Sequence, residues 1–448
     1  MKKRFFKTVL FFLVLASMQV KAIENSQKYS LRQCLDFALN NSYSLHKAKL
    51  DISGADYQIQ EGKSEVLPQI NATGSMDHSL VLSTTMLPGE IIGQPGMQIP
   101  VQMGAKNVLD FGVHVEQVVF APALFTGIKI ARNNLELEKL RAIMTKEEII
   151  FNVSNAYYDI LNNMQELDNI NYMISMQDSL YLLMKKRVDE NVTREVDLNR
   201  IKVNLTNLKA RGNNIKNAIL QQTRYFQILI GAPLDDAFVL DDSEFKNLKI
   251  ADNQMYSKPH NKIEIDIMNK QIEIIGLEIR KEKQNYLPTL SAIASGGYQF
   301  QSDNLNLSKE PWFSSALIGV RLSVPLFDGF GRRNRIRKKQ LQLRSLEWDI
   351  RESKQTLSAD YLNSINQLEV IYGLVQAQSD NLQLAEKVYT QTLALFSEGL
   401  ATVTDILETE TSLHEVKIAY ATELIRYKKT EINFLKARGT LDDLLNNN

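Results

Sequence analysis

Two carboxylates near the start of a predicted helix are the clearest sign of charge-based chemistry in the sequence. Asp405 and Glu408 are three residues apart, so both project from one face of a helix that Thr402 or Thr404 could cap. Gly399 is suited to end the preceding helix. Carboxylates near a helix start are stabilised by the helix dipole, and a solvated acidic face is common there. The spacing alone leaves a stabilising role and a functional role open.

Motifs for catalysis are missing from the sequence. The five histidines are scattered and form no His-Glu-x-x-His zinc motif: His46, His78, His114, His260 and His414. No Gly-x-Ser-x-Gly element or phosphate-binding Gly-Lys-Ser/Thr loop occurs either. Lys and Arg (52) balance Asp and Glu (52), which gives no indication of nucleic-acid binding. We therefore expect no enzyme activity, no cofactor and no metal site.

The N-terminus indicates export. Residues 1–22 contain a basic start, an apolar run over residues 9–16 and a Val20-Lys21-Ala22 cleavage site, as in a secretory signal peptide. The single cysteine, Cys34, excludes an intrachain disulfide. It lies well past the cleavage site, so we expect a small buried helix residue and no lipidation.

The rest of the 448-residue chain is an internal duplication. Markers recur in the same order: Leu67-Pro68 as Leu287-Pro288, Leu124-Phe125-Thr126-Gly127 as Leu326-Phe327-Asp328-Gly329, Asp197 as Asp405, and Gly231 as Gly439. We assign residues 23–236 to the first repeat, 237–257 to a linker, and 258–448 to the second repeat with a short C-terminal tail.

Both repeats have the same predicted order of elements. A helix (30–65 or 262–285) ends at Leu-Pro, since proline lacks the N–H that a helix needs. Two strands follow, then a long helix (127–190 or 331–398) and a shorter one (193–230 or 402–438). The long helices have apolar residues at alternating spacings of four and three, apart from one missed position in each run, which is typical of a coiled coil. These positions are Val153, Tyr157, Ile160, Met164, Leu167 and Ile174, and Tyr361, Ile365, Leu368, Tyr372, Val375 and Leu382.

The predicted strands alternate apolar and polar residues, which indicates two different faces. About ten residues suffice for a tilted strand to cross a bilayer. Four strands cannot close a barrel, so several chains would have to contribute to one. Two chains would give eight strands and three would give twelve. Polar positions suited to a water-filled interior are Asp77, His114, Glu116 and Arg321, and residues 81–107 are predicted to be an exposed loop at the outer mouth.

This duplicated order of helix, Leu-Pro, hairpin, Leu-Phe-x-Gly and long helical hairpin resembles the TolC family of outer-membrane efflux channels. The resemblance covers essentially the whole mature chain. It implies an α+β membrane protein: a long antiparallel α-helical coiled-coil barrel in the periplasm plus a transmembrane β-barrel of four strands per chain, closed by trimerisation. It also implies a passive exit duct in the outer membrane, which a periplasmic adaptor (membrane fusion protein) and an inner-membrane transporter recruit for efflux or type I secretion.

The resemblance implies roles for the helix ends. Asp405 and Glu408 would form two rings of three carboxylates that gate the periplasmic entrance and raise one another's pKa. Asp197 and Phe396 stand where the family ties its two tip hairpins together, although Phe396 lacks a tyrosine hydroxyl and Ala401 replaces a basic residue. The tips expected to contact the adaptor are Asn191, Val192 and Thr193, and Gly399, Leu400 and Ala401.

Two other classes share some of these features. A periplasmic coiled-coil adaptor or scaffold would have the signal peptide and the long hairpins, but it needs neither two-faced strands nor a duplication. An extracellular adhesin fits exposed coiled coils but not Leu-Pro at matching places. The transported substrate is not encoded in any motif of the chain.

Overall fold

A computed structural model describes residues 28–93, 95–190, 194–235, 238–241, 262–304, 307 and 311–446. The predicted signal peptide and all of the predicted linker except residues 238–241 lie outside the described residues. The chain forms two compact units that alternate along the sequence. The strand unit consists of Asp51–Lys139 and Ile267–Ile350, and the tip unit consists of Met1–Leu50, Leu140–Asp266 and Arg351–Asn448.

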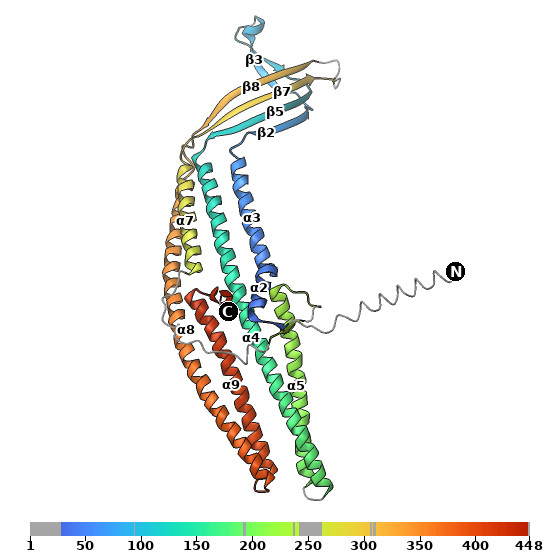
Figure 1. The fold of residues 1–448 in the computed structure, drawn as a ribbon. Helices are drawn as coiled ribbons and strands as arrows, with labels where there is room; N and C mark the ends of the chain where they lie inside the picture. Colours follow the sequence, from blue (N-terminus) through green and yellow to red (C-terminus); the bar gives the residue numbers. More distant parts are fainter. Residues whose placement is uncertain are drawn as a thin grey trace, which may run out of the picture. The chain divides into compact units, whose positions relative to one another are not determined.

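The strand unit is built on a four-stranded antiparallel sheet in the order β2-β5-β7-β8 (Figure 1). Its strands are β2 (Gln69–His78), β5 (Asn107–Phe120), β7 (Thr289–Ser302) and β8 (Trp312–Ser323). The central pair joins β5 of the first half of the chain to β7 of the second half. All four predicted strands are confirmed.

The two faces of this sheet differ as the alternation predicts. One face exposes apolar side chains, among them Ile70 (68%), Val320 (69%) and Ile318 (90%). The opposite face carries the polar cross-strand positions, where Arg321 Nη1 lies 3.4 Å from Glu116 Oε2. Because neighbouring residues of a strand point to opposite faces, a single register aligns both sets.

The predicted outer loop contains structure that the sequence analysis missed. Strands β3 (Thr84–Pro88) and β4 (Gln98–Gln102) form an antiparallel hairpin, and a short 3-10 helix, η1 (Gly89–Ile92), lies between them. A second missed element is the two-residue parallel pair of β1 (Lys28–Tyr29) with β6 (Val239–Leu240).

The helices follow the predicted order closely. They are α2 (Leu31–Asn41), α3 (Tyr43–Ser64), α4 (Pro122–Asp189), α5 (Glu195–Ile230), α7 (Ile263–Gln284), α8 (Gly331–Ser397), α9 (Val403–Arg438) and the short α10 (Asp443–Asn446). The first predicted helix is broken at Ser42, and α4 begins earlier than expected, since Pro122 is well suited to a first helical turn. Within the described residues, no helix is long and apolar enough to span a membrane.

The core of the tip unit includes several of the predicted coiled-coil positions. Val153, Tyr157 and Ile160 of α4 are almost fully buried, and they pack in one cluster with Cys34 and Leu35 of α2. Leu368 and Val375 of α8 form a second cluster with residues of α9. The predicted burial of Cys34 on a helix is thus confirmed, and these five heptad positions are buried.

Candidate functional site

The second tip hairpin is the connection from α8 to α9 in the tip unit (Figure 1). Gly399 follows α8 with a φ of 77°, a left-handed conformation that glycine adopts without a Cβ clash. Thr402 then caps α9, and its Oγ1 accepts a hydrogen bond from Asp405 N at 3.2 Å. Of the two caps that the sequence allowed, the chain uses Thr402.

Asp405 completes a capping box at the start of α9. Its Oδ2 accepts hydrogen bonds from the Thr402 backbone N–H and from Thr402 Oγ1, both at 2.7 Å. These bonds, the backbone one first, hold the pKa of Asp405 below its usual range. In the single chain, therefore, this carboxylate is charged and positioned by its own helix.

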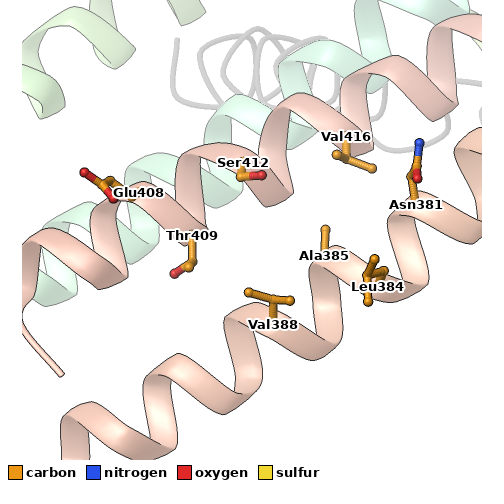
Figure 2. A pocket seen from close by; sticks show the side chains of 8 residues that line it. All are labelled: Asn381, Leu384, Ala385, Val388, Glu408, Thr409, Ser412 and Val416. Carbon is orange, nitrogen blue, oxygen red and sulfur yellow. The ribbon is translucent and has the colours of Figure 1, made fainter. Parts of the chain in front are cut away.

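Glu408 lies one turn further along α9 and is exposed. It borders a groove of about 370 Å³ between α8 and α9, which Figure 2 displays. The other lining residues are uncharged: Asn381, Leu384, Ala385, Val388, Thr409, Ser412 and Val416. Asp405 and Glu408 are thus both available to solvent on α9, as their spacing predicts.

Asp197 lies at the start of α5, in the first tip hairpin. It forms ion pairs within its own segment, with Arg194 at 3.5 Å and Arg200 at 3.9 Å. It also lines a groove of about 780 Å³ that includes Thr402 and other residues at the start of α9. The two tip hairpins therefore face each other across this groove.

Phe396, at the end of α8, contacts the first tip hairpin through Arg187 and not through the predicted partner Asp197. The guanidinium of Arg187, in the last turn of α4, lies over its ring at 5.1 Å from the centroid. A cation over an aromatic ring is attracted by the ring quadrupole. Phe396 thus contacts the first tip hairpin through this cation–π pair. The sequence analysis missed the pair, and the basic residues at the end of α4 were the signal that could have indicated it.

The turn residues of the second hairpin are open to solvent. Gly399 and Leu400 are exposed, the latter at 73%, and Ala401 is half-buried. The corresponding residues of the first hairpin, Asn191, Val192 and Thr193, lie outside the described residues. Within the described residues, no group of three His, Cys, Asp or Glu side chains could hold a metal ion.

The Arg187–Phe396 pair predicts a measurable coupling between the hairpins. In a double-mutant cycle of Arg187→Ala and Phe396→Ala, we expect a coupling energy of about 1 kcal/mol, since Arg187 is half-buried. Urea unfolding in detergent provides the measurement. The exposed Lys186 supplies the control, because Lys186→Ala combined with Phe396→Ala should be additive. If the effects of Arg187→Ala and Phe396→Ala on stability were additive, the two side chains would not be coupled, which would contradict the prediction.

Comparison with known proteins agrees with this architecture. The family described as outer membrane efflux protein matches residues 271–440. Outer membrane protein TolC of Salmonella enteritidis is 21% identical over 436 residues, which cover 93% of this chain and 83% of the relative. Two solved structures are similar in fold, each with a TM-score of 0.69 and 15% identity: the outer membrane protein VceC from Vibrio cholerae (91% of this chain, 96% of that one) and the Campylobacter jejuni CmeC outer membrane channel (92% and 85%).

The chain carries an outer membrane efflux protein domain and is similar to TolC. It is located in the outer membrane with a large periplasmic helical domain, and it serves as an exit duct for efflux or secretion. The TolC-like family is a channel family and not an enzyme class.

Proposed function

We propose that three copies of this chain close a 12-stranded transmembrane barrel above a periplasmic α-helical barrel. The observation that carries this proposal is the four-stranded sheet, whose faces are polar and apolar and whose edge strands, β2 and β8, each have one neighbour within the described residues. An open edge cannot lie in lipid, because its backbone groups would have no hydrogen-bond partners. Pairing β8 of one copy with β2 of the next satisfies both edges.

The edge helices of the strand unit support the same arrangement. Helix α8 exposes Leu341 (65%) and Trp348 (66%), seven residues apart, with the exposed Arg344 between them. Helix α3 exposes Tyr57 (74%) and Glu61. Exposed apolar side chains of this size are suited to a neighbouring copy, and the opposite charges favour α8 against α3.

The gate of this trimer is formed by Asp405 and Glu408. Both residues are exposed on α9 in the single chain, and Asp405 is charged there. Three copies therefore supply two rings of three carboxylates. Acidic rings favour cations and disfavour anions in a pore. The turn around Leu400 docks the periplasmic adaptor together with residues 191–193, and the adaptor links the channel to an inner-membrane transporter.

Single-channel recording in planar bilayers tests the gate. We compare the wild type with Asp405→Asn/Glu408→Gln, which removes both charges and preserves the shape of the side chains. We expect low, cation-selective conductance in the wild type and higher conductance with little selectivity in the double variant. The control is Glu398→Gln, an exposed tip carboxylate outside the proposed rings, which should leave selectivity unchanged.

The outcomes separate the parts of the proposal. Selectivity that survives the double substitution would exclude these two residues from the gate but preserve the channel. Native mass spectrometry of the detergent-extracted protein tests the trimer independently, and a predominantly monomeric or dimeric species would overturn the 12-stranded barrel.

A further inference from the structure

Three polar side chains are buried together in the tip unit, away from the tip turns. Gln177 of α4 is 5% exposed, and Glu410 and His414 of α9 are 4% and 2% exposed. Gln177 Nε2 donates a hydrogen bond to Glu410 Oε2 at 3.1 Å. Glu410 and His414 are four residues apart, so they lie on the same face of α9. None of the three belongs to the proposed gate.

The cluster contains more acceptors than donors. Glu410 Oε1, Gln177 Oε1 and both ring nitrogens of His414 are buried without a hydrogen-bond partner among the described residues. Buried polar atoms of this kind are costly, because they lose their contacts with water. A proton on Glu410 would supply a donor where one is missing, and it would also remove a buried charge.

The charged and titratable groups around the cluster come from all three helices. On α4, the Tyr172 ring lies 5.8 Å from the His414 ring. On α9, Lys417 Nζ lies 5.3 Å from the Tyr172 ring, and it is 3.6 Å from Glu386 Oε1 of α8. On α8, burial raises the pKa of Tyr389 to about 12, with further contributions from the charges of Glu410 and Tyr172. Lys417 is engaged by Glu386, so Glu410 is an acid without an ion-pair partner.

Burial favours the uncharged form of both residues, and its effects on pH dependence have opposite signs. It raises the pKa of Glu410 from the ordinary value of 4.5 to about 7, against a smaller opposing effect of the Gln177 hydrogen bond. Packing therefore weakens as the pH rises from 4.5 to about 7. Burial lowers the pKa of His414 from the ordinary value of 6.5 to about 4, with a further contribution from Lys417. Packing therefore strengthens as the pH rises from about 4 to 6.5.

We propose that Glu410 and His414 are a compensating acid–base pair that makes the packing of α9 against α4 and α8 insensitive to pH. The two windows overlap between the ordinary pKa of glutamate, 4.5, and that of histidine, 6.5. Within that range one group gains the stability that the other loses. The inference goes beyond the proposed gate, because it concerns packing inside one chain and holds whether or not the channel conducts. Its consequence is a tip with constant geometry at mildly acidic pH.

Hydrogen exchange of the full-length protein in detergent tests this pair. Protection of the α9 amides is measured from pH 5 to pH 8 and corrected for the intrinsic exchange rate. We expect wild-type protection to stay within about threefold. In Glu410→Gln only the histidine effect remains, so protection should rise by more than about tenfold over this range. In His414→Phe only the glutamate effect remains, so protection should fall by more than about tenfold.

The double variant Glu410→Gln/His414→Phe should be flat again, and the exposed Glu415→Gln should behave as the wild type. His414→Gln repeats the test without an aromatic ring, in case phenylalanine disturbs packing. A merely structural role would shift protection equally at every pH. Single variants without a pH slope, or with slopes of the same sign, would overturn the proposal.

Discussion

Replacing Arg332 with methionine is expected to lower the free energy of unfolding of the strand unit by about 3 kcal/mol. The side chain of Arg332 is only 5% exposed at the start of α8, where the chain enters the helix from β8. Its Nε donates to Asp328 Oδ2 at 3.0 Å, and its Nη1 donates to the Asn285 carbonyl oxygen at 2.8 Å. Its guanidinium also lies over the Tyr286 ring, 4.6 Å from the centroid. One side chain thus ties the end of α7 to the start of α8.

The backbone beside Arg332 explains why this tie is needed. Gly329 and Phe330 have φ values of 64° and 66°, and the left-handed conformation is unfavourable for phenylalanine. Asp328 compensates by accepting the Arg332 backbone N–H at 2.8 Å, the leading cause of its lowered pKa. Methionine would preserve much of the apolar volume and the backbone N–H that Asp328 accepts. It would remove the guanidinium donors to the Asn285 carbonyl oxygen and to Asp328 Oδ2.

Tryptophan fluorescence during urea unfolding measures this effect, because both tryptophans, Trp312 and Trp348, lie in the strand unit. The neighbouring Arg333→Met is the matched control, since Arg333 is exposed. We expect the control to change stability by less than about 0.5 kcal/mol. Equal effects of the two substitutions would mean that the buried contacts of Arg332 contribute nothing.

Most of the helical architecture could be predicted, because it depends on local signals. The heptad residues of α4 and α8 follow helical periodicity, and Gly231, Gly399 and Gly439 mark helix ends with φ values between 77° and 81°. The strands were predictable for the same reason, since alternation over ten or more residues fixes both faces at once.

The missed elements depend on pairing between residues or on turn chemistry. The loop that contains Pro88 and Pro100 has the composition of an irregular segment, yet those residues fit an isolated two-stranded hairpin, where proline is tolerated at an edge. Strands β1 and β6 are two residues each and pair across more than 200 residues, which no local pattern encodes.

The candidate site was predictable only in part, again because of register between helices. Thr402 and Asp405 form a capping box within four residues, which is a local signal, although the sequence analysis left both Thr402 and Thr404 open as the cap. The contact of Arg187 with Phe396 requires the relative rotation of α4 and α8, which the heptads do not determine to the nearest residue. Glu410 occupies a buried position although a charged residue predicts exposure, so only the structure reveals it.

Replacing Gly231 with alanine is expected to destabilise the tip unit by about 3 kcal/mol, the sum of backbone strain and steric overlap. Gly231 follows α5 with a φ of 79°, and an added Cβ would overlap the carbonyl oxygen of Asn41 and lie 2.7 Å from its carbonyl carbon. Asn41 ends α2, so the overlap involves backbone on both sides and cannot be relieved by a rotamer change.

Gly399 provides a matched control for this substitution, because its φ is 77° but no atom of the described residues lies within 4 Å of the position of an added Cβ. Gly399→Ala should therefore cost only the left-handed strain, about 1 kcal/mol. Loss of helical circular dichroism in urea measures both variants in detergent. The difference between them isolates the steric contact of α5 with the end of α2. If Gly231→Ala were no more destabilising than Gly399→Ala, the close approach of Gly231 to Asn41 would not constrain this position, and φ alone would account for the glycine.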